Sequence, residues 1–223
     1  MNSDNSGTPG LRRGSQRCEC VHEGSRARLI AITGGPGAGK SAVLELAARS
    51  FCGHVVILPE SATILFGGGF PRIPGVAARS AAQRAIFRVQ RELERMALED
   101  GRFAIILCDR GTLDGVAYWP GEPEGFWRDL ETTREEELRR YAAVLHLETP
   151  TANDGYNHLN PTRIESPDEA HIIDLKTRAV WDGHPSRAII PSSHNFPEKA
   201  LHALEWLHGQ LPPCCNHRSL SGG

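Results

Sequence analysis

The chain carries the stretch Gly34-Gly35-Pro36-Gly37-Ala38-Gly39-Lys40-Ser41, which has the form G-x-x-x-x-G-K-[ST] of a phosphate-binding loop. The apolar residues 28–33 before it are short enough to be a buried strand. Residues 42–48 after it combine good helix formers with apolar side chains at helical spacing. A glycine-rich turn between a strand and a helix points successive backbone N–H groups into one concavity, at the positive end of the helix dipole. The flanking segments therefore favour a site for a nucleoside triphosphate over a glycine-rich turn that fits the pattern by chance.

The individual residues of this stretch, which we call the phosphate loop, suit a triphosphate. Gly37 and Gly39 let the backbone approach a phosphate without a Cβ in the way. Lys40 would reach the β- and γ-phosphates, and the Ser41 hydroxyl would ligate Mg²⁺. The Asn-Lys-x-Asp motif that reads guanine does not occur in the sequence, which favours adenine without excluding GTP. We therefore expect ATP and Mg²⁺ as cofactors, with ATP bound along the whole of Gly34–Ser41.

Composition limits the classes of partner. The 223 residues include 25 basic and 27 acidic side chains, a net charge of −2, so no strong field would recruit nucleic acid or an anionic membrane. No apolar run approaches the ~20 residues of a membrane helix, and the N-terminus lacks the apolar core of a secretory signal. We expect a cytoplasmic protein with a small-molecule substrate and no nucleic-acid or membrane partner. Its expected parts are a flexible tail over residues 1–27, one domain over 28–210 and a second flexible tail over 211–223.

Six cysteines are present. Cys52 and Cys108 adjoin apolar runs and are expected to be buried thiols in a reducing compartment. The pairs Cys18-x-Cys20 and Cys214-Cys215-Asn216-His217 fall in opposite tails and lack the paired C-x₂-C spacing of a zinc site. We interpret the tail cysteines as incidental, with metal binding as the alternative.

Short apolar runs alternate with helical patterns, which indicates parallel strands joined by crossover helices. Strands are predicted at residues 28–33, 54–60, 103–108, 142–147 and 187–190. Beyond the first helix, helical patterns begin at Ser80, Thr133 and Ser166 and in a last segment near Ala200, with capping boxes at Thr133 and Ser166. Residues 66–75 are too rich in Gly and Pro for regular structure, and 151–165 form a long polar connection. The expected fold is a three-layer α/β P-loop NTPase, whose five-stranded, mainly parallel sheet has helices on both faces.

Charged residues follow two of the predicted strands. Glu60 ends the second strand, and Asp109-Arg110 directly follow the third. Ligands of open parallel sheets bind beyond the carboxyl ends of the strands, where the phosphate loop also lies. There Asp109 would hold Mg²⁺ through water, Arg110 would neutralise the moving phosphoryl group, and Glu60 would take or orient the proton of an acceptor hydroxyl. The alternative is that these are surface residues that pair with each other or with solvent.

Further candidates line the expected acceptor pocket. Asp114 and Tyr118 lie four residues apart and share a face if the segment between them is helical, although Tyr118 could equally be a packing residue. Gln90 and Arg84 lie on the long helix predicted from Ser80 to about Asp100, where the Gln90 amide could bind a base-like ring or could be solvated. Arg163 in the polar connection is a candidate lid arginine that closes over the triphosphate, with a surface arginine as the alternative.

The chain resembles the AAA-type ATP-binding domains grouped with nicotinamide riboside kinase and the TRPL translocation defect protein, over residues ~28 to ~208. The matching stretches are Ile32–Ser41, Pro59-Glu60, Asp109–Tyr118, Tyr156-Asn157, Asn160–Arg163, Glu169-Ala170 and Trp181 with His184-Pro185.

More distantly, the layout is similar to thymidylate kinase and the deoxynucleoside kinases, which carry an acid after the second strand and an acid–arginine pair after the third. That similarity implies Glu60 as the base, Arg110 as the phosphate clamp and Arg163 as a lid residue. Asp114 stands where thymidylate kinases usually have a small hydroxyl residue, which argues against a thymidylate substrate.

The leading hypothesis is a small-molecule kinase that transfers the γ-phosphoryl group of Mg·ATP to a hydroxyl of a nucleoside-like metabolite. Its catalytic residues would be Lys40, Glu60, Arg110 and Arg163, with Ser41 and Asp109 at the metal and Gln90, Asp114 and Tyr118 at the acceptor. The acceptor would lie between residues 66–75 and the long helix. A nucleotide-dependent switch that acts through a protein partner and a plain ATPase are the alternatives.

Overall fold

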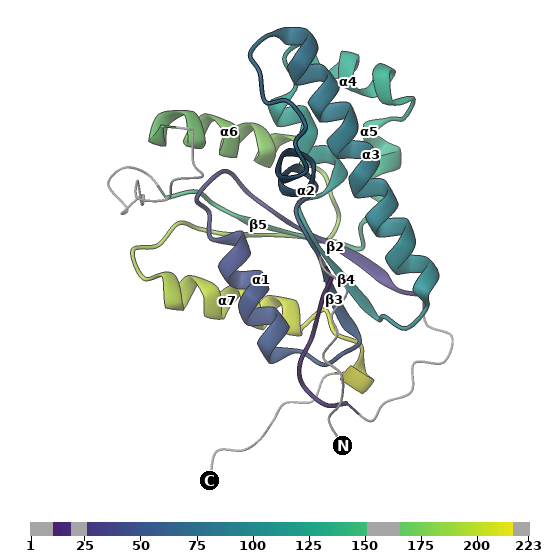
Figure 1. Ribbon diagram of the computed structural model, residues 1–223. Helices are drawn as coiled ribbons and strands as arrows, with labels where there is room; N and C mark the ends of the chain where they lie inside the picture. The colour runs from purple at the N-terminus through teal and green to yellow at the C-terminus, as the bar shows by residue number, and fades with distance from the viewer. Residues whose placement is uncertain (1–10, 19–25, 151–165, 216–223) are drawn as a thin grey trace.

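A six-stranded sheet forms the centre of the computed structural model, which describes residues 11–18, 26–150 and 166–215 (Figure 1). The strand order is β1-β3-β4-β2-β5-β6, and every neighbouring pair is parallel except β1 and β3. The strands are β1 (Arg12–Arg13), β2 (Arg28–Thr33), β3 (Val55–Leu58), β4 (Ile105–Asp109), β5 (Ala143–Leu147) and β6 (Arg187–Ile190).

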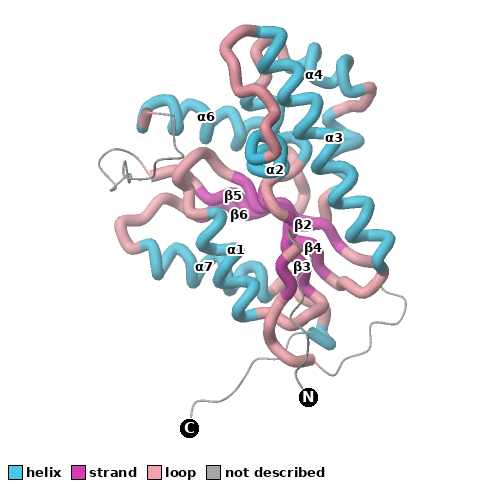
Figure 2. The backbone as a smooth tube through the Cα atoms, viewed as in Figure 1, coloured by secondary structure: helices cyan, strands magenta, loops and turns pink. Residues whose placement is uncertain are grey.

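Helices cover both faces of this sheet, as Figures 1 and 2 show, so the predicted three-layer α/β fold is confirmed. The helices are α1 (Lys40–Ser50), α2 (Ser61–Gly67), α3 (Val76–Asp100), α4 (Pro123–Leu130), α5 (Arg134–Arg140), α6 (Pro167–Val180) and α7 (Phe196–His208), with short 3₁₀ helices η1 (Thr112–Tyr118) and η3 (Pro213–Cys215). Helices α1 and α7 pack together on one face, and α3 to α6 lie on the other.

The central strands are buried on both sides. In β2, Ile30 and Ile32 pack into the layer under α1 and α7, whereas Leu29 and Ala31 pack into the opposite layer. Because successive side chains of a strand alternate between the two faces, a strand covered on both faces is continuously apolar. This burial explains why β2 reads as an uninterrupted apolar run and why its carboxyl end holds the phosphate loop firmly.

The sheet has one strand more than predicted. Strand β1 pairs antiparallel with β3, with Arg12 opposite Ile57 and Arg13 opposite Val56, in the stretch that the sequence assigns to the N-terminal tail. Both arginines are exposed, so the pairing depends on the backbone and leaves no apolar pattern in the sequence. The prediction of five strands is therefore wrong by this edge strand. Leu211 and Cys215, in the predicted C-terminal tail, are also buried against the core.

Several helix boundaries differ from the sequence pattern. Helix α3 begins at Val76 and not at Ser80. Gly75, with φ 112°, ends the preceding loop, and residues 76–79 are compatible with a helix. Helix α2 extends into the predicted loop 66–75, and α4 was not predicted. The capping boxes at Thr133 and Ser166 are both formed, as predicted.

Within the described residues, none of the helices combines the length and the apolar composition that crossing a membrane requires.

Candidate functional site

The phosphate loop connects β2 to α1, in the strand–loop–helix arrangement that the sequence predicts. Gly34, Gly37 and Gly39 have φ of 132°, 81° and 93°, the left-handed region that side chains with a Cβ rarely adopt. A Cβ on Gly34 would lie 2.0 Å from the carbonyl oxygen of Leu147. Two of these glycines were expected to permit close approach of a phosphate, and the backbone angles show that the conformation itself also needs glycine.

Lys40 folds back onto its own loop. Its Nζ donates to the carbonyl oxygens of Gly34 and Gly35, each at 2.9 Å. The side chain is buried, and that burial, together with the nearby positive charge of Arg110, lowers the pKa of Lys40 to about 8. The lysine is therefore protonated at neutral pH. Among the residues that the structure describes, its hydrogen-bond acceptors are neutral carbonyl oxygens, so a bound anion would stabilise its charge further.

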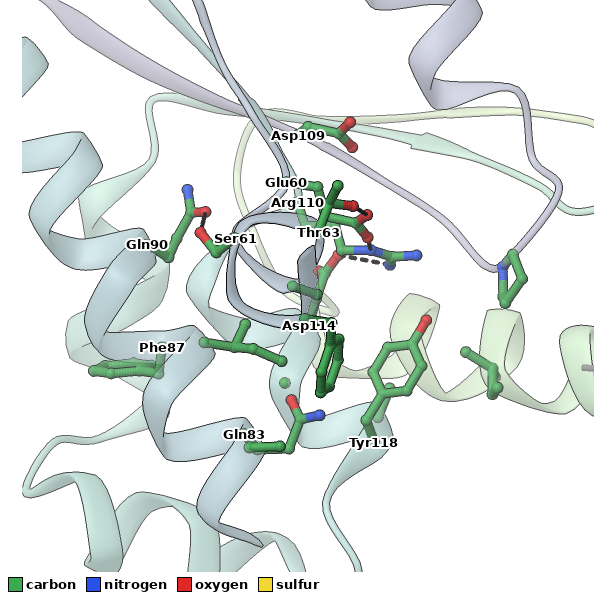
Figure 3. Close-up of a pocket in the computed structure, with 18 of the residues that line it drawn as sticks. Glu60, Ser61, Thr63, Gln83, Phe87, Gln90, Asp109, Arg110, Asp114 and Tyr118 are labelled. Atoms are coloured by element: carbon green, nitrogen blue, oxygen red, sulfur yellow. Dashed lines mark hydrogen bonds and ion pairs between the residues drawn. The ribbon is translucent and has the colours of Figure 1, made fainter. Parts of the chain in front are cut away.

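Asp109 ends β4 and lies deep in the crevice, at one end of the group of residues in Figure 3. Burial raises its pKa to about 6, against the opposing effect of the Lys40 charge. Among the described residues its Oδ1 atom is buried with no hydrogen-bond partner. Ser41 lines the same cavity. A buried carboxylate oxygen without a donor and a hydroxyl in the same cavity are oxygen ligands that suit a hard divalent cation such as Mg²⁺.

Arg110 lies at the centre of a charged cluster, which Figure 3 shows from the side of the cavity. Its Nε donates to Glu60 Oε1 at 2.7 Å, and its Nη1 donates to the Gly34 carbonyl oxygen at 3.1 Å and to Asp114 Oδ2 at 3.3 Å. The backbone of Arg110 has φ 74°, an unusual value for a side chain other than glycine that is found often at functional sites. The guanidinium thus ties the phosphate loop to the ends of β3 and β4.

The ion pair sets the charge of Glu60. Burial alone would raise the pKa of this carboxyl, but Arg110 and a 2.6 Å hydrogen bond from Thr63 outweigh it and lower the pKa to about 2. Glu60 is therefore ionised at any physiological pH. A carboxylate with so low a pKa is a good hydrogen-bond acceptor and a weak base.

Asp114 connects three elements and is almost fully buried. Besides Arg110, it accepts hydrogen bonds from Thr33 Oγ1 at 2.8 Å and from Trp181 Nε1 at 2.6 Å. The segment that carries it is a 3₁₀ helix, and Tyr118 from the same helix places its ring 5.5 Å from the Arg110 guanidinium carbon. Both residues line the cavity, but the Asp114 carboxylate serves protein donors.

Gln90 lines the cavity from α3 and is also buried. Its Oε1 accepts from Ser61 Oγ at 2.7 Å, and its Nε2 donates to Glu94 Oε1 at 2.8 Å. Much of the amide is thus engaged by the protein. Arg84 of the same helix pairs with Asp129 of α4 at 3.0 Å and is not among the residues that line this cavity.

The cavity that these residues share has a volume of about 1260 Å³. It begins at the phosphate loop, passes Glu60 and Arg110, and continues to Gln83 and Phe87 of α3, which lie with Tyr118 at the far end in Figure 3. A cavity of this size has room for two ligands that meet at the charged cluster.

Two residues that support the phosphate loop were missed by the sequence reasoning. Asp174 of α6 accepts from the Gly35 backbone N–H at 2.6 Å. Lys199 of α7 donates to the carbonyl oxygens of Ala38 at 3.0 Å and Glu148 at 2.6 Å. Neither stands in a motif or at a strand end, so no local signal distinguishes them from other helix residues.

Burial opposes ionisation of Asp174, but the His146 ring, whose Nε2 lies 3.2 Å from Asp174 Oδ1, and the Gly35 backbone N–H lower the pKa of this carboxyl, so it meets the loop as an anion. Arg163, the candidate lid arginine, lies outside the described residues.

Comparison with known proteins gives a family and a fold. A family model described as an AAA domain matches residues 29–199. The sequence matches no curated protein. Among solved structures, a NadR protein in complex with NR is 16% identical with a TM-score of 0.60, over 82% of this chain and 51% of that chain. A NadR protein in complex with NAD and AMP-PNP is 15% identical with a TM-score of 0.58, over 82% and 49%.

Thymidylate kinase from Candida albicans is 13% identical with a TM-score of 0.52, over 83% of this chain and 92% of that chain. At these identities the likeness shows the fold, and the chain spans about half the length of the NadR chains that it matches.

Proposed function

Because the chain belongs to the AAA domain family, in agreement with the grouping that its motifs predict, we propose that it is a cytoplasmic kinase that uses Mg·ATP. The γ-phosphoryl group would move to a hydroxyl of a small nucleoside-like molecule. One observation carries this proposal: the cavity does not end at the phosphate loop but continues past Glu60 and Arg110 to α3, which leaves room for an acceptor. A plain ATPase or a switch would need no room for an acceptor beside the nucleotide.

ATP would place its phosphates on the N–H groups of the phosphate loop. Lys40 would then exchange the carbonyl oxygens of Gly34 and Gly35 for phosphate oxygens, a gain because a charge-assisted hydrogen bond is about twice as strong as one to a neutral acceptor. Ser41 and, through water, Asp109 would hold Mg²⁺, which supplies neutralisation of the phosphate charge. The Oδ1 atom of Asp109, which has no hydrogen-bond partner within the described part of the chain, supports this assignment.

Glu60 would orient the acceptor hydroxyl. During transfer the new P–O bond forms to the acceptor oxygen, the bond between the γ-phosphorus and the bridging oxygen breaks, ADP leaves and the hydroxyl proton departs through Glu60. A carboxylate with a pKa of about 2 is a weak base. It suffices because a loose phosphoryl-transfer transition state demands positioning more than early proton removal. Arg110, fixed by Glu60 and Asp114, would face the moving charge, with Arg163 as a further cation from the segment outside the described residues.

The acceptor end of the cavity supports a flat, partly polar molecule. Phe87 and Tyr118 offer aromatic surface, and Gln83 offers an amide. Asp114 would act on the acceptor through Arg110, because its oxygens accept from Thr33 and Trp181. Gln90 would likewise act by positioning Ser61.

The test of this function is Glu60→Gln. We expect phosphate transfer from γ-labelled ATP to hydroxyl-bearing metabolites to fall about 100-fold, as for the loss of a positioned proton acceptor. The affinity for Mg·ATP should stay within about threefold, because Glu60 hydrogen-bonds Arg110 and Thr63 and not the phosphate loop. Transfer is measured by label recovered in the metabolite and by ADP release.

Glu92→Gln is the matched control, since it removes the same charge from an exposed position on α3. Unchanged transfer in Glu60→Gln would refute the role of Glu60. Label that reaches only water, whatever metabolite is present, would establish an ATPase, and nucleotide-dependent capture of a protein without turnover would establish a switch.

The affinity for Mg·ATP is expected to depend on pH through Lys40. The pKa of Lys40 is lowered to about 8 in the free protein, and a bound triphosphate favours the ammonium form, so binding above pH 8 requires uptake of a proton. Affinity should fall by no more than about twofold between pH 7 and 8 and by up to about tenfold per pH unit above that. Calorimetric titrations from pH 7 to 9.5 measure the effect.

Lys199, which also contacts the loop and has its pKa lowered to about 8 by burial, provides the control. Lys199→Met should retain the decline. An affinity that stays constant to pH 9.5 in the wild-type protein would show that Lys40 does not carry the bound charge.

A further inference from the structure

Three cysteines and a histidine lie together at the end of the sheet opposite the phosphate loop. They are Cys18, Cys52, His54 and Cys215, and one ligand atom from each lies within 4.8 Å of all the others. Cys52 and His54 precede β3 and therefore lie at the amino end of the parallel strands, whereas the phosphate loop follows the carboxyl end of β2. In Figure 1, the yellow 3₁₀ helix η3 that ends with Cys215 lies at this end of the molecule. The cluster is therefore separate from the nucleotide site.

The distances in the cluster match a tetrahedral metal site. His54 Nδ1 lies 3.6 Å from Cys215 Sγ and 3.8 Å from Cys52 Sγ. In a tetrahedral zinc site with Zn–S bonds of about 2.3 Å and Zn–N bonds of about 2.1 Å, the nitrogen and sulfur ligands are about 3.6 Å apart. The side chains thus stand close to the spacing that one zinc ion would impose.

The backbone holds three separate segments in register at this point. Gln16 bridges to Cys52 and its N–H donates to the Phe51 carbonyl at 3.0 Å, which fixes the segment that leads to Cys18. Gly14 packs so closely that a Cβ there would lie 2.1 Å from the Cys52 carbonyl oxygen. These main-chain contacts, together with side-chain hydrogen bonds to the last turn of α1, position the N-terminal segment. The donors therefore converge because the fold brings their segments together.

The last ligand comes from the C-terminal end of the described chain. Cys215 is 4% exposed, packs against the core under α1 and α7, and lies in a turn closed by its N–H to the Pro212 carbonyl at 2.9 Å. Cys52 is equally buried, whereas Cys18 is partly exposed and leaves a path for an ion to enter. Buried sulfur and nitrogen donors in a set of four are the ligands that zinc prefers, and hard ions such as Mg²⁺ and Ca²⁺ avoid them.

We propose that Cys18, Cys52, His54 and Cys215 bind one Zn²⁺ in a closed structural site. The four side chains fill the tetrahedral shell, so no position is left open for a substrate or water, which is typical of a structural and not of a catalytic zinc. On binding, the three thiols become thiolates and release three protons, and the imidazole binds as a neutral ligand through Nδ1. The ion joins the N-terminal segment beside β1, the loop between α1 and β3, and η3.

The spacing of the cysteines does not reveal this site. The sequence groups Cys18 with Cys20 and Cys215 with Cys214 in opposite tails without zinc-site spacing, which favours incidental cysteines over the alternative of metal binding. The cluster takes one cysteine from each tail and adds the Cys52-x-His54 pair, which no standard zinc motif contains.

The test is metal binding by the full chain, purified under reducing conditions. We expect one equivalent of Zn²⁺ by elemental analysis after dialysis, and the intense absorption of tetrahedral cobalt with thiolate ligands after exchange with Co²⁺. Cys18→Ser should retain the fold, because this side chain lies at the edge of the cluster, and should weaken zinc binding at least tenfold with a changed cobalt spectrum. His54→Ala should do the same with a loss of nitrogen ligation.

Cys108→Ala is the matched control, since it removes a buried thiol from the opposite layer of the core and should keep one equivalent of zinc. The proposal is refuted if the reduced, folded wild-type chain binds neither Zn²⁺ nor Co²⁺ at micromolar concentration. It is equally refuted if Cys18→Ser and His54→Ala bind zinc as the wild type does, or if Cys108→Ala loses it. Nucleotide binding does not enter any of these readouts.

Discussion

Lys40→Met is expected to weaken the binding of Mg·ATP about 100-fold or more. The variant removes a buried ammonium that would make charge-assisted hydrogen bonds to the phosphates, each worth about 1.5–3 kcal/mol. Calorimetric titration with Mg·ATP and with Mg·AMP-PNP measures the loss. Methionine matches the length of the lysine stem, so the wall of the crevice should keep its shape.

The fold of Lys40→Met should persist. The pKa of the lysine indicates how loss of its charge changes the free energy of unfolding. Since burial lowers the pKa of Lys40 from 10.5 to about 8, the folded protein holds the ammonium less well than the unfolded chain does, at every pH below about 8. Removing the charge relieves that penalty. It also leaves the Gly34 and Gly35 carbonyl oxygens without their donor, at a cost of about 1 kcal/mol each.

The two effects oppose each other, so the free energy of unfolding should change by about 1–2 kcal/mol at most. Thermal unfolding with and without Mg·ATP separates stability from binding, because at one nucleotide concentration the Tm of the wild-type protein should rise more than that of the variant. Equal nucleotide-induced increases in Tm for the two proteins would contradict the assignment of Lys40 to the nucleotide site.

Arg110→Met is expected to lower the free energy of unfolding by about 3–5 kcal/mol and to abolish phosphate transfer. The guanidinium bridges Glu60, Asp114 and the Gly34 carbonyl oxygen, and methionine leaves two buried or partly buried carboxylates without their cation. Chemical denaturation at pH 7 measures the loss. Without Arg110, burial is the largest remaining influence on Glu60, so the pKa of Glu60 should rise from about 2 towards or above 4.5.

Arg110→Lys serves as the matched variant. It restores the charge but cannot reach three partners at once with one ammonium group, so its stability should lie between those of Arg110→Met and the wild type. Its phosphate transfer should remain low. Stability of Arg110→Met within 1 kcal/mol of the wild type would show that the cluster does not hold the loop and the strands together.

The sequence predicted those parts of the fold that depend on local chemistry. The phosphate loop was recognisable because Gly34, Gly37 and Gly39 need a backbone that only glycine adopts readily, and because a strand and a helix flank them. The central strands were recognisable because burial on both faces demands a continuous apolar run. Strand β1 was not predicted, because it pairs through its backbone and its two arginine side chains are exposed, which leaves no apolar pattern.

The candidate site likewise contains residues that a local sequence pattern reveals and residues that only tertiary packing brings to it. Glu60, Asp109 and Arg110 were found because the carboxyl ends of parallel strands converge, and the structure brings all three to one cavity. Asp174 and Lys199 reach the phosphate loop only through the packing of α6 and α7, which no local pattern encodes. The role of Asp114 as an acceptor for three donors likewise depends on tertiary contacts, with Thr33 and Trp181.

A structure of the chain with Mg·AMP-PNP tests the central claim most directly. We expect the triphosphate on the N–H groups of Gly34–Ser41, Lys40 Nζ moved from the Gly34 and Gly35 carbonyl oxygens to phosphate oxygens, and Mg²⁺ between Ser41 and Asp109. The γ-phosphate should point towards Glu60 and the open part of the cavity. A nucleotide bound elsewhere, or a Lys40 that keeps its two carbonyl partners while the nucleotide is bound, would contradict the account.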